Sequence, residues 1–298
     1  MLKIRMWAGA TCLMLLLAAG ALAQTADIPP MMQVGEAEVY ALSDYRMLNQ
    51  LSNFMSGKNL EIARQMLPSG TENGYINAYL VKINKQNILI DTGLGAERGG
   101  KLMLQLAELG LHSKDIDAVL FTHLHIDHVG GALAQSEPAF PQAVLWASQP
   151  EADYWGQDIK FPAAQQGSMP VAKQALQTKS IKYFKPGDEI LPGISSMPAF
   201  GHTPGHSAFM ITSGDARLLI WGDIMHVPSV QFANPDIGVD YDVDQKRAMQ
   251  TRRQFLALVV EQDLMIAGMH LVFPGWGKVE KNRNDQDAEY IFLPFEQD

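Results

Sequence analysis

Short apolar runs alternate with polar, turn-forming segments along most of the chain, a pattern that predicts a mixed α/β protein. Runs of strand length occur at 36–42 (an edge strand by its alternation), 78–83, 87–90, 118–121, 144–147, 194–199, 208–211, 218–221, 264–267 and 291–293. Helical spacing of apolar residues predicts helices over 102–109, 150–155 and 244–260, and helical pieces within 45–67. Residues 156–180 lack such periodicity and are expected to form a long loop or short helices. Strands mixed with helices in two similar halves predict two sheets with helices outside.

The beginning of the chain has the layout of a secretory signal peptide. Two basic residues precede an apolar run, and Ala21-Leu22-Ala23 supplies the small residues typical of a cleavage site. We predict a cleaved signal peptide over 1–23, a flexible leader over 24–35 and a single domain over 36–298. An uncleaved anchor is the alternative, which the shortness of the run disfavours. Cleavage implies a periplasmic or secreted protein with no membrane segment left.

Charge and cysteine content narrow the classes of partner. The formal net charge is -9, and an acidic surface argues against nucleic acid and anionic lipid as partners. The one cysteine, Cys12, lies inside the predicted signal peptide. The exported chain would therefore contain no disulfide and would depend on a large apolar core for its stability.

The densest group of chemically active residues is the H-x-H-x-D-H run from His123 to His128, directly after the apolar run 118–121. Imidazole nitrogens with a carboxylate suit Zn²⁺ or a similar divalent ion. His123 and His125 are two residues apart and point the same way from an extended segment. Asp127 and His128 follow where the chain turns into a helix, so a helix cap is the alternative use of Asp127.

Three further candidate ligands, His202, Asp223 and His270, each follow an apolar run. With the first cluster they give five histidines and two aspartates, which suffice for two divalent cations that share one carboxylate. Taken singly, each has a structural alternative: a turn residue for His202, a strand terminator for Asp223 and a core histidine for His270.

In order and spacing, these blocks resemble the metallo-β-lactamase superfamily over about residues 74–277. The resemblance is carried by Asp91-Thr92-Gly93, the H-x-H-x-D-H run, Gly201-His202, Gly222-Asp223 and His270. It implies an α/β fold, a four-layer αββα sandwich with the metals at one edge between the sheets, and hence a metallo-hydrolase domain over 36–298.

The resemblance also implies a division of the ligands between two metal ions. The first ion would bind His123, His125 and His202, the second would bind Asp127, His128 and His270, and Asp223 would bridge them. Zn²⁺ is the favoured ion, with Mn²⁺, Fe²⁺ or Co²⁺ as alternatives. Asp91 would support a histidine ligand from behind, with a plain turn residue as the alternative, and His206 would be a supporting or structural residue.

Three further blocks narrow the resemblance: Asp127-His128-Val129-Gly130-Gly131, Val230-Gln231-Phe232 with Asn234-Pro235 just after it, and His270-Leu271-Val272-Phe273-Pro274-Gly275. Within the superfamily, they most resemble the branch of methyl parathion hydrolases and lactonases. The resemblance implies a hydroxide bridging two metals that attacks a lactone or aryl ester carbonyl, with Asp127, Asp223 and His226 as catalytic residues. His226 stands three residues after the bridging aspartate, where acyl-homoserine lactonases have a tyrosine that polarises the lactone; a buried structural histidine is the alternative. Hydrolysis of organophosphate triesters and metal binding without turnover are the competing functions.

Aromatic residues near these blocks are candidates for the substrate pocket. Trp155, Phe161, Phe232 and Phe273 would form an apolar wall that selects small, neutral or hydrophobic esters and lactones, with a place in the core as their alternative. Homodimers are frequent in this branch, so residues 45–67 are candidates for a lid or a dimer interface.

Overall fold

The structure is a computed structural model and describes residues 28–135, 137–282 and 288–295. The predicted signal peptide and residues 24–27 of the predicted leader lie outside these ranges. None of the helices in the described ranges is long and apolar enough to cross a membrane.

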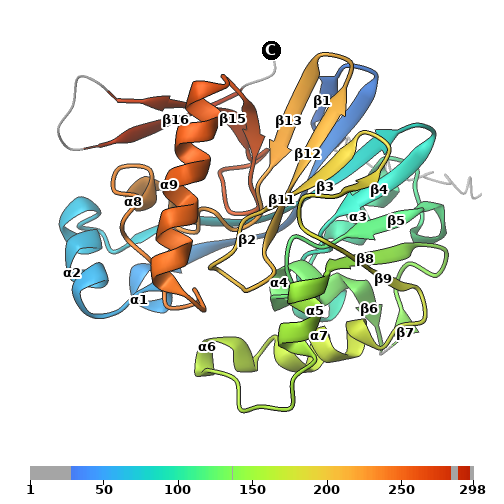
Figure 1. The fold of residues 1–298 in the computed structure, drawn as a ribbon, viewed down its shortest axis with the longest axis horizontal. Helices are drawn as coiled ribbons and strands as arrows, with labels where there is room; N and C mark the ends of the chain where they lie inside the picture. Colours follow the sequence, from blue (N-terminus) through green and yellow to red (C-terminus); the bar gives the residue numbers. More distant parts are fainter. Residues whose placement is uncertain (1–27, 136, 283–287, 296–298) are drawn as a thin grey trace, which may run out of the picture.

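Two seven-stranded sheets form the centre of the molecule (Figure 1). In spatial order, the first contains β1 (Met31–Val34), β2 (Ala37–Gln50), β3 (Thr71–Ile83), β4 (Gln86–Ile90), β5 (Ala118–Leu120), β8 (Val144–Ser148) and β9 (Ile181–Phe184). The second contains β10 (Glu189–Leu191), β11 (Ile194–Pro198), β12 (Ser207–Ser213), β13 (Ala216–Ile220), β14 (Met265–Ala267), β15 (Trp276–Lys281) and β16 (Tyr290–Pro294). A small hairpin joins β6 (Leu133–Ala134) to β7 (Glu137–Pro138).

Helices cover the outer face of each sheet. The first sheet packs against α3 (Leu102–Glu108), α5 (Gln149–Trp155) and α7 (Met169–Leu176), and the second against α9 (Gln245–Glu261). A separate apolar cluster joins α1 (Leu51–Phe54), α2 (Gly57–Met66) and α8 (Pro228–Gln231). The remaining α-helices of the described ranges are α4 (Ile126–Val129) and α6 (Ala163–Gln166), and 3-10 turns span Ala96–Arg98, Ser113–Asp115 and Gly130–Ala132.

The main apolar core lies between the two sheets. It contains Val39, Val81 and Leu120 from the first sheet and Phe209 and Ile220 from the second, all at most 1% exposed. Two further clusters fill the spaces between each sheet and its helices. These alternating layers confirm the four-layer αββα sandwich, because each sheet is buried on both faces.

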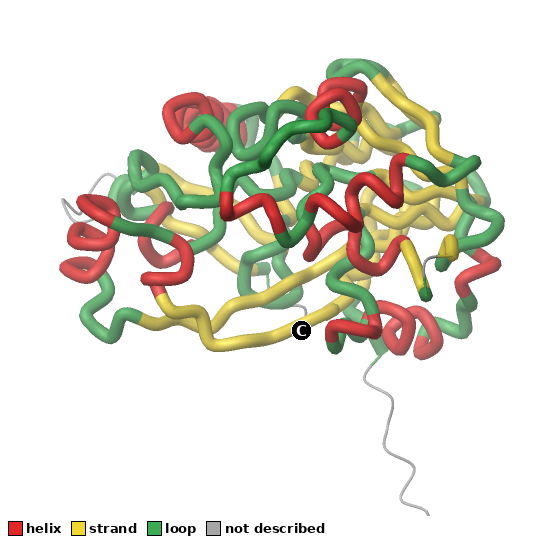
Figure 2. Tube along the Cα trace, turned by 90° about the horizontal axis from the view of Figure 1, so that it is seen from below, coloured by secondary structure: helices red, strands yellow, loops and turns green. Residues whose placement is uncertain are grey.

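Parallel pairing brings several strand ends to one edge of the sandwich. Strands β4, β5 and β8 run parallel in the first sheet, as do β13 and β14 in the second. Their carboxyl ends therefore share an edge, where loops leave the sheets. Figure 2 shows the molecule from below the view of Figure 1, with helices and loops in front of part of the strands.

Three predictions for the N-terminal part of the domain are wrong: the edge position of the strand at 36–42, helical structure over 45–50, and a flexible leader over 31–34. The predicted edge strand at 36–42 begins a 14-residue strand, β2, which pairs with β1 on one side and β3 on the other. It runs on to Gln50, so helix begins only at Leu51. Residues 31–34, placed in a flexible leader, form β1, because the backbone groups of Met31–Val34 pair with β2. Strands β6, β7, β9, β10 and β15 were not predicted either.

Candidate metal centre

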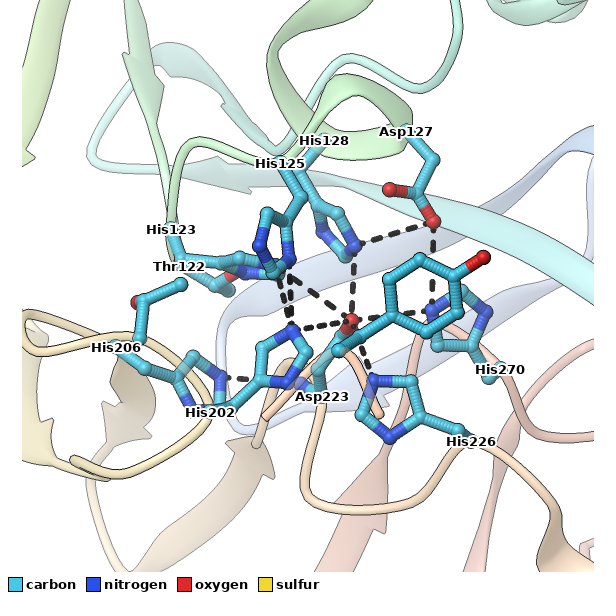
Figure 3. A network of polar contacts seen from close by, with 12 residues as sticks. Thr122, His123, His125, Asp127, His128, His202, His206, Asp223, His226 and His270 are labelled. Atoms are coloured by element: carbon cyan, nitrogen blue, oxygen red, sulfur yellow. Dashed lines mark hydrogen bonds and ion pairs between the residues drawn. The ribbon is translucent and has the colours of Figure 1, made fainter. Parts of the chain in front are cut away.

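Histidine and aspartate side chains from both sheets converge at the shared edge (Figure 3). The loop after β5 and the start of α4 bring four of them, His123, His125, Asp127 and His128. The turn between β11 and β12 brings His202, the loop after β13 brings Asp223 and His226, and the loop after β14 brings His270. The structure thus brings together all seven residues predicted as metal ligands.

The first group contains His123, His125, His202 and Asp223, whose ligand atoms all lie within 4.8 Å of one another. The Nδ1 atom of His125 lies 2.9 Å from His123 Nε2 and 2.8 Å from His202 Nε2, and the two Nε2 atoms are 3.2 Å apart. Asp223 Oδ2 lies 3.6 Å from His123 Nε2 and 3.3 Å from His202 Nε2. Ligand atoms about 2.05 Å from a tetrahedral Zn²⁺ lie about 3.3 Å apart, so this group fits such an ion.

The second group contains Asp127, His128 and His270, again facing Asp223. The Nε2 atom of His128 lies 3.2 Å from Asp223 Oδ1 and 3.6 Å from Asp127 Oδ2. The Nε2 atom of His270 lies 3.2 Å from Asp223 Oδ2 and 3.5 Å from Asp127 Oδ2. His128 Nε2 and Asp223 Oδ1 are both buried, and the contact between them lacks the geometry of a hydrogen bond. These donor atoms suit a second divalent cation, and Asp223 faces both groups.

Hydrogen bonds behind the histidines fix the orientation of their rings. His128 Nδ1 lies 2.7 Å from Asp91 Oδ2, and Asp91 also accepts the Oγ1–H of Thr122. His202 Nδ1 lies 2.9 Å from Asp242 Oδ1, and His270 Nδ1 donates to the Tyr75 carbonyl at 2.8 Å. Such partners hold the other ring nitrogen toward a metal.

His206 holds the backbone at Asp223. Its Nδ1 donates to the Ala199 carbonyl at 2.9 Å, which leaves Nε2 free to accept the Asp223 backbone N–H at 3.0 Å. The preceding residue, Gly222, has φ +63°, and a Cβ there would lie 2.3 Å from His206 Nε2. Glycine at 222 therefore permits both the turn and the close approach of the ring.

Burial and the neighbouring charges divide the protonation states of the histidines. Burial and the nearby imidazoles hold the pKa of His123 and His125 well below the usual value. Burial also lowers the pKa of His202, but Asp223 and Asp242 outweigh it and raise the pKa to about 9. Without a metal ion, His202 therefore holds a proton at neutral pH, which cation binding would displace.

His226 lies beside the two groups without a hydrogen-bonded support of its own. Its Nε2 is 3.1 Å from Asp223 Oδ2, and its Nδ1 has no hydrogen-bond partner within the described ranges. The ring is stacked on His270, with 5.3 Å between the centroids. Burial, with the charge of His202, lowers the pKa of His226 to about 4, so the ring is neutral at pH 7.

A cavity of about 580 Å³ opens above these side chains. Its floor contains His125, Asp127, His202, Asp223, His226 and His270. Its walls are mostly apolar or aromatic: Tyr45, Met47, Phe54, Tyr75, Ile76, Leu94, Ile126, Ala163, Ala164 and Tyr241. Such a space suits a small molecule with an apolar body.

The four aromatic residues predicted for the pocket wall do not line this cavity. Trp155 and Phe161 stack on each other in the core beneath the helices of the first sheet, at 0% and 3% exposure. Phe232 is buried under α9, and Phe273 packs at the edge of the core between the sheets. Their large apolar surfaces are more stable inside the core than in an open cavity.

Two carboxylates at the site were missed in the sequence. Asp242 supports His202, and Glu151 accepts hydrogen bonds from the loops that carry His123, His125 and His202. Neither belongs to a metal-ligand motif, and each reaches the site only through the tertiary fold. The sequence holds one local signal near Glu151. Ser148, three residues earlier, is a typical helix N-cap residue, and in the structure its side chain accepts the Glu151 N–H.

Comparison with known proteins agrees with this geometry. The family described as the metallo-beta-lactamase superfamily matches residues 71–270. A probable metallo-hydrolase of Mycobacterium tuberculosis is 25% identical over 249 residues, which cover 68% of this chain and 78% of that protein.

Two solved structures are similar over 90% of this chain. AidC, described as a dizinc quorum-quenching lactonase in complex with its N-hexanoyl-L-homoserine product, has a TM-score of 0.81, 26% identity and 98% of its own chain covered. AbOPH, described as a hydrolase in the beta lactamase superfamily, has a TM-score of 0.79, 30% identity and 97% of its own chain covered.

Proposed function

The chain belongs to the metallo-beta-lactamase superfamily and is a metal-dependent hydrolase, and we propose that it hydrolyses lactones or aryl esters with a neutral, apolar body. The observation that carries the proposal is the apolar cavity directly above two groups of metal-ligand side chains that share Asp223. AidC, described with a lactone-derived product bound, supports the lactone class.

In this proposal the first divalent ion is held by His123, His125 and His202. The second ion is held by Asp127, His128 and His270, and Asp223 contributes to both sites. When bound, the pair of ions would lower the pKa of water and polarise the substrate carbonyl. Zn²⁺ is the favoured ion because the first group is rich in imidazole nitrogen.

The protein's own groups have three roles in this reaction. Asp223 faces both groups: its Oδ2 lies 3.3 Å from His202 Nε2 and 3.2 Å from His270 Nε2, and its Oδ1 lies 3.2 Å from His128 Nε2. Burial raises the pKa of Asp127, but His128 and His270 outweigh it and hold that pKa below its usual range, so Asp127 stays ionised and suits a cation. Neutral His226 presents a ring N–H to the carbonyl oxygen or to the leaving oxygen.

The test combines metal analysis with a substrate panel. Purified protein should contain about two divalent ions per chain and should hydrolyse a long-chain lactone or an aryl ester with a higher kcat/KM than a phosphotriester. Asp223→Ala should lose both the second ion and most of the turnover. A preference for the phosphotriester would favour the alternative substrate class, and two bound ions without turnover would favour a metal-binding protein.

We also propose that the chain is exported, on the basis of residues 1–23 alone. A cell-fractionation experiment tests it: the mature protein should appear in the periplasm or medium with Gln24 as its first residue. A cytoplasmic protein that begins at Met1 would contradict export without affecting the proposed reaction.

A further inference from the structure

Glu151 is a buried carboxylate that belongs to neither ligand group. It lies on α5 and is 1% exposed, and within the described ranges no cationic side chain donates a hydrogen bond to it. Four donors surround its two oxygens, two on each. An ionised carboxylate can be kept in a dry interior when hydrogen bonds replace its lost hydration.

The two oxygens serve different segments of the chain. Oε1 accepts the backbone N–H of Leu124 at 2.9 Å and the indole N–H of Trp155 at 2.6 Å. Leu124 stands between His123 and His125. Oε2 accepts the hydroxyl of Thr203 at 2.6 Å and the backbone N–H of Gly205 at 3.0 Å, both in the turn that carries His202.

The start of α5 is tied to the same turn by further contacts. The Ser148 hydroxyl donates to the Gly205 carbonyl at 2.7 Å. A Cβ at position 205 would lie 2.1 Å from the Glu151 backbone nitrogen, so glycine allows the turn to approach the helix this closely. Trp155, one turn further along α5, holds the carboxylate in place from the other side.

We propose that Glu151 is a positioning residue for the first metal ion: its carboxylate sets the distance between the loop of His123 and His125 and the turn of His202. The inference rests on the proposed function, because it concerns the same ligand group. The two segments come from different sheets, and their ligand atoms lie only 2.8 Å apart at His125 Nδ1 and His202 Nε2. A rigid link just behind these histidines keeps that approach when no ion is bound.

The test is Glu151→Gln, which keeps the shape of the side chain but replaces one acceptor oxygen with an NH₂ group. That group cannot accept a hydrogen bond, so the bond from either the Leu124 N–H or the Gly205 N–H is lost. Chelator competition should show the affinity of one ion falling 10- to 100-fold, the range for an outer partner of a ligand, while the other ion binds as in the wild type. The ion that Glu151→Gln retains should be lost on adding Asp127→Ala, which identifies it as the second ion.

Asp44→Asn is the matched control. Asp44 on β2 is also a buried carboxylate, 0% exposed. It accepts the backbone N–H groups of Leu94 and Leu102 at 2.8 and 2.9 Å. The segment between these two residues contains no member of the first ligand group. Asp44→Asn should lower the thermal midpoint of the metal-free protein and leave the affinity of the first ion unchanged.

The inference would be overturned if Glu151→Gln bound both ions with wild-type affinity. It would also be overturned if the variant lost affinity equally at both sites. Should Glu151→Gln fail to fold, Thr203→Val removes one donor to Oε2 and should weaken the first ion at the lower end of that range; unchanged binding there also overturns the inference. Wild-type protein that binds no ion at all would instead contradict the proposed function, so the two failures are distinguishable.

Discussion

At the scale of single residues, His226 is the candidate for direct contact with a substrate, because it lines the cavity and is not one of the proposed metal ligands. It lines the cavity, is 4% exposed, and stands between His202 and His270, with 4.5 Å and 5.3 Å between ring centroids. The pKa of about 4 keeps its ring neutral at neutral pH. A neutral imidazole carries one N–H, which can be donated to an oxygen of a bound ester.

Replacing this histidine with leucine tests its part in turnover. We expect His226→Leu to lower kcat for a lactone by about 100-fold, the lower end of the range for a lost proton donor, while metal content stays as in the wild type. The measurement is steady-state kinetics together with metal analysis of the same sample.

His226→Gln is the matched control, since its amide keeps a donor of similar reach and should recover part of the lost rate. Full turnover by the leucine variant would show that His226 has no catalytic part. Loss of metal from both variants would show instead that the ring is needed to hold an ion.

At the scale of helices and strands, regular apolar spacing predicted most of the sandwich. The helix expected at 244–260 is α9, Gln245–Glu261, and its N-cap Asp244 accepts the Arg247 N–H. The prediction of helical structure at 45–50 was wrong, because these residues belong to β2. Tyr45, Met47 and Asn49 face inward, whereas Leu48, 60% exposed, faces out. An apolar residue on the outer face breaks the two-residue period and imitates helical spacing.

The residues of the candidate metal centre could be identified from local motifs, and the residues around them could not. His123, His125 and His128 lie within six residues, and the other ligands each follow a strand, so their types and order carry the signal. Asp242 is 40 residues from His202, and nothing in its sequence neighbours marks it. The cavity walls include parts of β2, β3, α1, α4 and α6, and only tertiary packing brings these segments together.

The contact between β3 and α8 gives a prediction about pH. Glu72, near the start of β3, accepts hydrogen bonds from the Ser229 hydroxyl and backbone N–H, while its Oε1 is buried without a hydrogen-bond partner within the described ranges. Burial raises the pKa of Glu72 above its usual 4.5. The protonated carboxyl is thus favoured in the folded state, so its stabilising effect is present below pH 4.5 and is lost as pH rises through the raised pKa.

The glutamine in Glu72→Gln stays neutral at every pH. The unfolding free energy of the variant should therefore rise relative to that of the wild type as the pH increases from 4.5 through the raised pKa of Glu72. Urea unfolding at pH 4 and pH 8 measures the change: the difference in unfolding free energy, variant minus wild type, should be larger at pH 8. Glu61→Gln on α2 is the control, because that side chain is exposed. A difference that is the same at both pH values would contradict the assignment.

At the scale of the whole molecule, the candidate metal centre joins the two sheets at one edge. The first sheet and its loops contribute His123, His125, Asp127 and His128, and the second contributes His202, Asp223 and His270. Divalent ions at this place would link two layers that otherwise meet through their apolar faces.

Removing the ions should therefore destabilise the entire fold. An ion that binds only the folded chain adds about 2.7 kcal/mol when its free concentration is 100 times its dissociation constant. For a domain of this size that corresponds to roughly 5 to 10 °C in the unfolding midpoint for each site. We expect thermal unfolding followed by circular dichroism to show this fall after dialysis against a chelator, and recovery when Zn²⁺ is returned. Asp223→Ala should start from a lower midpoint and respond less to the chelator, because it lacks the shared ligand. An unchanged midpoint in protein proven free of metal would mean that the ions do not hold the two sheets together.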